Sequence, residues 1–106
     1  MTTRTMMAGL SATAFERIVT NSTAASLNST TRKAAGSVLR LSVETADVRY
    51  RSDGTAPTAT TGVLLQSDTA YEFYGFNGTS VFQFIDTGSG GVVNVERYQY
   101  PGEEGL

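Results

Sequence analysis

The stretch Ser37–Glu44, with the sequence SVLRLSVE, decides the fold class of this chain. Apolar and polar residues alternate along it. Successive side chains of a β-strand point to opposite faces of a sheet, so this alternation is typical of a strand with one buried face. The residues expected to face the core are Leu39, Leu41 and Val43, and those expected to face solvent are Arg40, Ser42 and Glu44.

The same pattern continues toward the C-terminus. Val48 and Tyr50 alternate with Arg49 and Arg51, and the turn residues Ser52–Gly54 follow them. Further short strands are expected over Val63–Leu65, around Tyr71 and Phe73, over Ser80–Asp86 and over Val92–Tyr100. Many short strands separated by Gly, Asn, Asp and Ser predict an all-β fold, a small antiparallel β-sandwich that is immunoglobulin-like or jelly-roll-like.

Two local features refine this prediction. The Asn77-Gly78 pair favours a tight two-residue hairpin between two of the expected strands. In the last strand the apolar parity moves from Val93 and Val95 to Tyr98 and Tyr100. This change indicates either a bulge near Glu96 or a strand that leaves one surface for another.

The N-terminal third is rich in Ser, Thr and Ala and carries few large apolar residues, so it cannot bury enough surface to fold alone. Thr13–Glu16 has the Thr-x-x-Glu form of a capping box, which favours a short helix. We expect an extended N-terminal arm over residues 1–21, either a mobile tail or a segment that orders on a neighbouring subunit. The sandwich domain is expected over residues 22–101, and a C-terminal tail over residues 102–106.

Composition excludes several classes of function. The chain has 106 residues, which suits one domain, and its 8 basic and 10 acidic residues give a net charge of -2 without a basic stripe for nucleic acid. It has no cysteine and no histidine, which removes disulfides, the usual zinc ligands and most catalytic nucleophiles and bases. We expect no enzymatic activity, no catalytic residues, no cofactor and no metal. No run of 18 apolar residues occurs, so neither a membrane span nor a secretory signal is expected.

A glycosidase needs a pair of acidic residues flanking the bond that it cleaves, and the chain has several carboxylates. They are instead scattered singly beside strand ends and turns, where a carboxylate can accept hydrogen bonds from nearby backbone N–H groups. The residues assigned this structural role are Asp47, Asp53, Asp68 and Asp86.

Surface contacts are the remaining route to function. Arg49 and Arg51 would form an exposed pair, either solvated or able to dock acidic residues of a partner. The aromatic residues between Tyr71 and Phe84 crowd two strands more densely than one core face requires. Most of them are expected in the core, and an excess on the second face would be an interface patch. So small a core suggests further stabilisation by packing in a homo-oligomer. The candidate interface residues are Phe15, Ile18, Arg49, Arg51, Tyr74, Phe76, Tyr98 and Tyr100.

The stretch Val43–Leu65, VETADVRYRSDGTAPTATTGVLL, resembles a segment of small virion proteins of tailed bacteriophages. In those proteins a strand ending Arg-Tyr-Arg runs into Asp-Gly-Thr-x-Pro-Thr and then into a Gly-x-Leu-Leu strand. The resemblance extends more loosely over residues 22–100, and this chain has Val63 where the family often carries histidine. Tyr50–Thr58 is also similar to a turn of immunoglobulin-like β-sandwich modules appended to bacterial carbohydrate enzymes.

This resemblance implies a non-enzymatic virion structural protein that is assembled in the host cytoplasm. The first function it implies is a capsid cement or decoration protein, whose partners are the major capsid protein or other virion proteins. The alternative is a neck or tail accessory protein, or a fibre module that binds host-surface glycan.

Overall fold

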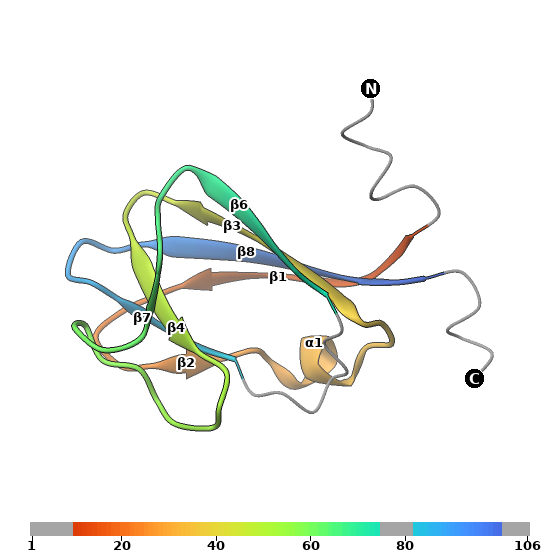
Figure 1. Ribbon diagram of the computed structural model, residues 1–106, viewed down its shortest axis with the longest axis horizontal. Coiled ribbons are helices and arrows are strands. Elements are labelled where there is room, and N and C mark those ends of the chain that lie inside the picture. The colour runs from red at the N-terminus through yellow and green to blue at the C-terminus, as the bar shows by residue number, and fades with distance from the viewer. Residues whose placement is uncertain (1–9, 75–81, 101–106) are drawn as a thin grey trace.

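The computed structural model describes residues 10–74 and 82–100 of the chain, and Figure 1 shows their arrangement. The described elements, in chain order, are β1 (Ser11–Val19), β2 (Ala25–Ser26), α1 (Ser29–Lys33), β3 (Val38–Glu44), β4 (Val48–Arg51), β5 (Val63–Leu65), β6 (Thr69–Tyr74), β7 (Gln83–Asp86) and β8 (Val92–Gln99).

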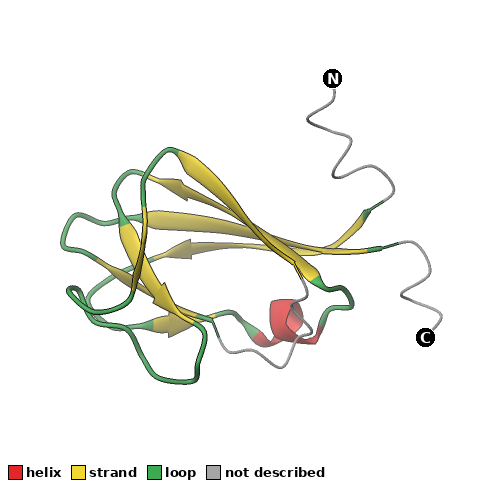
Figure 2. Cartoon of the chain, viewed as in Figure 1, coloured by secondary structure: helices red, strands yellow, loops and turns green. Residues whose placement is uncertain are grey.

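The strands form two four-stranded sheets. One sheet has the order β1-β8-β3-β6, the other has the order β2-β7-β4-β5, and all of their pairings are antiparallel. The described chain is mostly strand, and its short helix lies beside the sheets (Figure 2). The predicted all-β class is therefore confirmed.

The core lies between the two sheets. In β3 the predicted alternation is confirmed, because Leu39, Leu41 and Val43 are buried whereas Arg40 and Glu44 are exposed. The opposite sheet contributes an aromatic cluster to the same core. The ring centroids of Tyr50 and Phe82 lie 5.6 Å apart, and those of Phe82 and Phe84 lie 6.2 Å apart. The two sheets thus share one apolar interior, as a sandwich-like fold requires.

The N-terminal segment corrects two predictions. Ser11–Val19 is the edge strand β1, in which Ile18 is buried opposite Val93 of β8. The expected arm covers residues 1–21, but residues 11–19 of it form a strand of the sheet. The predicted helix start at Thr13–Glu16 is also wrong. The capping-box signal is local and weak, and it is overridden by sheet pairing with a strand near the other end of the chain. Residues 1–9 and 101–106 are outside the described residues.

The predicted irregularity near Glu96 lies in the partner strand instead. The register of β1 against β8 shifts between Ala12 and Ala14, whereas β8 stays regular. Val93, Val95 and Arg97 all belong to the buried side of β8. Because the third buried side chain is an arginine, the alternation of apolar residues breaks there, and the sequence suggested a bulge.

The hairpin predicted at Asn77-Gly78 is outside the described residues. Short helical structure does occur at α1, where the Asn28 side chain caps the helix by accepting a hydrogen bond of 2.9 Å from the backbone N–H of Thr31. Among the described residues, no helix has both the length and the apolar character to cross a membrane.

Candidate contact face on the outer side of one sheet

Three tyrosines lie together on the outer side of the β1-β8-β3-β6 sheet. Tyr74 of β6 and Tyr98 of β8 are both register partners of Val38 in β3, so they flank it in one row. Tyr100 follows β8, and its phenol lies near enough to that of Tyr74 for the two to interact electrostatically. We call Tyr74, Tyr98 and Tyr100 the tyrosine patch. Tyr74 and Tyr100 are 44% and 40% exposed, so their rings remain accessible to a partner.

Carboxylates hold the hydroxyl groups of two of these tyrosines. Tyr74 Oη donates to Glu72 Oε1 at 2.6 Å, and Tyr98 Oη donates to Glu96 Oε1. The bond to Glu72, followed by desolvation, raises the pKa of Tyr74 to about 12. The bond to Glu96 likewise raises the pKa of Tyr98. The rings of both tyrosines are held in place by the hydrogen bonds that their hydroxyl groups donate.

A shallow groove of about 260 Å³ lies beside the tyrosine patch on the same face. Phe15 in β1 is opposite Glu96 in β8, and Glu96 is in turn opposite Arg40 in β3. The Phe15 ring is 59% exposed and forms one wall of the groove. The polar residues that line it are Arg40, Ser42, Asn94 and Glu96.

Two contacts fix the polar side of this groove. Arg40 Nε lies 3.6 Å from Glu72 Oε2, and Asn94 Nδ2 donates to Glu44 Oε2 at 3.0 Å. Arg40 thus has a charge partner at its side, and the amide plane of Asn94 is oriented by Glu44. One exposed aromatic ring and several polar side chains therefore line one open hollow.

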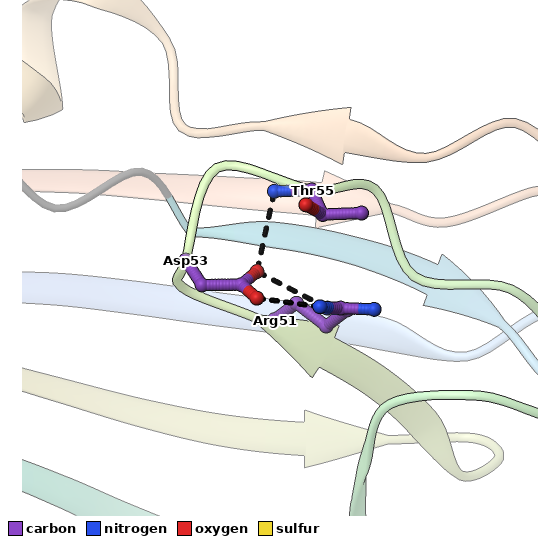
Figure 3. A network of polar contacts seen from close by, with 3 residues as sticks. All are labelled: Arg51, Asp53 and Thr55. Atoms are coloured by element: carbon purple, nitrogen blue, oxygen red, sulfur yellow. Dashed lines mark hydrogen bonds and ion pairs between the residues drawn. The ribbon is translucent and has the colours of Figure 1, made fainter.

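The predicted arginine pair lies on the other sheet. Arg49 Nε and Nη1 donate to the carbonyls of Ala59 and Gly62 at 3.1 and 2.9 Å. Arg51 forms two hydrogen bonds to Asp53, whose carboxylate also accepts from the backbone N–H of Thr55 (Figure 3). These bonds lower the pKa of Asp53 to about 2, and the bond to Arg51 contributes most. Both arginines therefore hold the loop between β4 and β5.

The loop between β4 and β5 makes the two outer faces different. Arg49 points away from the core row of Val48 and Tyr50, and it reaches carbonyls of residues 59–62. The loop consequently lies against the outer side of the β2-β7-β4-β5 sheet. On the opposite sheet, Phe15, Tyr74 and Tyr100 stay exposed.

The structure thus separates the eight candidate interface residues. Ile18 is buried in the core, and Phe76 is outside the described residues. The members that share the outer face of the β1-β8-β3-β6 sheet are Phe15, Tyr74, Tyr98 and Tyr100. The groove could not be predicted from the sequence. Phe15, Glu96 and Arg40 are neighbours only because of the strand order, which no local pattern indicates.

The predicted turn roles of two aspartates are confirmed, since Asp86 accepts from the backbone N–H of Ser89 at 2.9 Å and Asp53 from that of Thr55 at 3.2 Å. Asp47 instead accepts from the backbone N–H of Ser67 at 2.9 Å, so it links two loops that are distant in the sequence. Asp68 lies at a turn with a positive φ of 61°. Within residues 10–74 and 82–100, no three His, Cys, Asp or Glu side chains are grouped so as to hold a metal ion.

Comparison with known proteins adds one likeness. No protein-family model and no curated protein matches the chain. Among solved structures, the chain is similar to the solution NMR structure of a de novo designed double-stranded β-helix, with 11% identity and a TM-score of 0.49. The similarity covers 82% of this chain and 100% of the designed one. It carries no argument about what the chain does.

Proposed function

We propose that this chain is a non-enzymatic structural module of a virion, a cement or decoration protein that bridges capsid subunits. The observation that carries the proposal is the exposed tyrosine patch, set on a paired sheet whose interior is already filled by its own core. The resemblance of Val43–Leu65 to phage virion proteins is the reason for proposing a virion as the larger assembly. The partner in this proposal is the major capsid protein or another virion protein.

The strand order supports a jelly-roll type of sandwich. The orders β1-β8-β3-β6 and β2-β7-β4-β5 mean that the chain changes sheet at every connection except that between β4 and β5. Eight strands in two such sheets suit the double-sheet jelly roll, an architecture that recurs in capsid domains and in lectins. This support is an analogy of fold and leaves the choice of function to the surface.

The chemistry of the patch suits adhesion. Tyrosine is enriched at the energetic centres of protein interfaces because it combines a large apolar ring with a hydrogen-bonding end. Tyr74 and Tyr98 are already oriented by Glu72 and Glu96, so little side-chain entropy is lost when a partner binds. Many copies on one shell would add such modest contacts together.

The charges on this face indicate the chemistry of the partner. The outward side chains include three carboxylates but only two arginines, and these residues are Glu44, Glu72, Glu96, Arg17 and Arg40. A complementary surface would be apolar at its centre and carry arginine or lysine at its rim.

Retention on purified particles tests the proposal. We expect the double variant Tyr74→Ser and Tyr100→Ser to fold normally and to be lost from particles during washing. The matched control is Val63→Ser with Leu64→Ser, which removes two exposed apolar side chains from the other sheet and should leave retention unchanged. Equal retention of both double variants would contradict the role of the tyrosine patch.

Copy number separates the capsid role from the neck or tail role. A cement protein is present in proportion to the capsid subunits, whereas a neck or tail protein is present as one or a few rings. Quantitative mass spectrometry of purified particles distinguishes these cases.

A further inference from the structure

We propose that the groove between Phe15 and Arg40 binds one ring of a neutral saccharide. This inference does not rest on the virion role of the chain, because it concerns the groove residues Phe15, Ser42 and Asn94, which are not part of the tyrosine patch. The groove and the patch are adjacent, so a saccharide and a protein partner would compete for this face.

The aromatic wall provides the apolar half of the recognition. A pyranose presents one face made largely of C–H groups, which packs on an aromatic ring. Phe15 is 59% exposed although it belongs to a paired strand, and its side chain borders the groove. Burying this ring against a sugar face would remove apolar surface from water on both sides.

The floor and the opposite wall provide the polar half. Asn94 and Ser42 are register partners on neighbouring strands, so their side chains lie together in the groove. Within the described residues, no hydrogen bond is formed by the Ser42 hydroxyl or by Asn94 Oδ1. Together with the Asn94 amide N–H and the Glu96 carboxylate, they offer both donors and acceptors to neighbouring sugar hydroxyls.

The charges favour a neutral sugar over an acidic one. Arg40 lies 3.6 Å from Glu72, so its charge is already matched. Glu96 adds a negative charge to the groove and accepts a hydrogen bond from the neutral Tyr98 hydroxyl. A sugar carboxylate would be repelled by Glu96, whereas a sugar hydroxyl could donate to it.

The size of the groove limits the ligand. About 260 Å³ is less than the roughly 300–1,000 Å³ of pockets that enclose drug-sized molecules. The groove therefore fits a single ring, and because it is open to solvent, that ring could be part of a longer polysaccharide.

Backbone amide NMR of the full chain tests this inference. The probes are methyl glycosides of glucose, galactose, mannose and N-acetylglucosamine, with glucuronic acid as the charged comparison. We expect at least one neutral glycoside to shift the amide signals of Phe15, Ser42 and Asn94 in a saturable way, while glucuronic acid does not.

Two variants assign the binding to the groove. We expect Phe15→Ala to weaken the affinity about tenfold, and Asn94→Ala to weaken it to a similar degree. The control is Val19→Ala, because Val19 is 60% exposed on the same strand and the same face but outside the groove. The same spectra report whether each variant is folded.

Three results would overturn the inference. These are the absence of saturable shifts with every neutral glycoside, a preference for glucuronic acid, and shifts centred on the tyrosine patch instead of the groove. None of these results concerns retention on particles, so the proposed virion role is tested independently of this inference.

Discussion

At the scale of single residues, Arg97 links strand β8 to α1 and to the segment that follows this helix, through side-chain hydrogen bonds. Its side chain is only 1% exposed, and it donates to the carbonyls of Thr31, Arg32 and Gly36 at 2.8 to 3.1 Å. Two of these carbonyls belong to α1, near whose C-terminal end a positive charge is favourable. Its burial is thus compensated by several charge-assisted hydrogen bonds.

Replacing this arginine should destabilise the fold. Arg97→Met keeps much of the side-chain volume but leaves the three carbonyls without these donors, so we expect the free energy of unfolding to fall by about 2–4 kcal/mol. Urea denaturation measures the loss. Arg17→Met, on the solvent-exposed side of β1, is the control and should change stability by less than about 0.5 kcal/mol. Equal effects of the two substitutions would refute the structural role of Arg97.

Gly36 provides a second prediction at this scale. Its φ is +127°, and a Cβ atom there would clash with the carbonyl oxygen of Tyr98. Gly54 also has a positive φ, +88°, but a Cβ there would meet nothing within 4 Å. We therefore expect Gly36→Ala to destabilise the protein by more than Gly54→Ala, whose cost should be about 1–2 kcal/mol. Thermal unfolding of both variants would show the order, and similar losses would contradict the close approach at Gly36.

Asp53 makes stability depend on pH. Its pKa is lowered from 3.8 to about 2 in the folded chain, chiefly by the hydrogen bond to Arg51, so the folded state favours the carboxylate. The resulting stabilisation is complete above the unfolded pKa and is lost as the pH falls through about 2. Both side chains face water, so the effect should be small.

The variant Asp53→Asn isolates this contribution. We expect it to have a lower urea midpoint than the wild type at pH 7, and the difference should shrink as the pH falls from 3.8 toward 2. A difference that stays constant over this range would show that the ionised carboxylate is not its cause.

At the scale of elements, β1 is a paired strand in a segment that was expected to be part of an N-terminal arm. Because Ser11–Val19 is part of the sheet, its inward residue Ile18 matters to folding, and its outward neighbour Val19 does not. We expect Ile18→Ala to cost about 2–4 kcal/mol and Val19→Ala less than about 0.5 kcal/mol in urea denaturation. Two equally small losses would mean that this segment behaves as an arm in solution.

Elements with a local signal were predictable from the sequence. The alternation of β3 and the short apolar run of β5 each identify a strand within a few residues. In β1 that signal is weak, because the outward residues include the apolar Phe15 and Val19 and the inward ones include Glu16. Its place in the sheet depends on β8, which lies far along the chain.

The candidate site was predictable only in part. The excess of aromatic residues between Tyr71 and Phe84 indicated that some of them would be exposed, and Tyr74 is. That Phe15 and Tyr98 share its face depends on the strand order. The groove and the loop-holding role of Arg49 follow from strand order and from the path of a loop. Both depend on tertiary structure, which residue patterns do not encode locally.

At the scale of the whole molecule, the two outer faces have different surroundings. The loop between β4 and β5 lies against one sheet and is held there by Arg49. The other sheet presents Phe15, Tyr74 and Tyr100 to solvent. A module with one such face suits attachment to a larger surface. Homo-oligomerisation stays a prediction, which sedimentation velocity of the isolated chain tests.

Radical footprinting of the tyrosines in the assembled state tests the contact face most directly. Hydroxyl radicals oxidise exposed aromatic side chains, so labelling of Tyr74 and Tyr100 can be compared between the free chain and purified particles that carry it. We expect strong protection of both residues on the particle, with Val63 and Leu64 on the other sheet labelled equally in the two states. Equal labelling of Tyr74 and Tyr100 in the free and assembled chain would contradict the proposal that this face makes the contact.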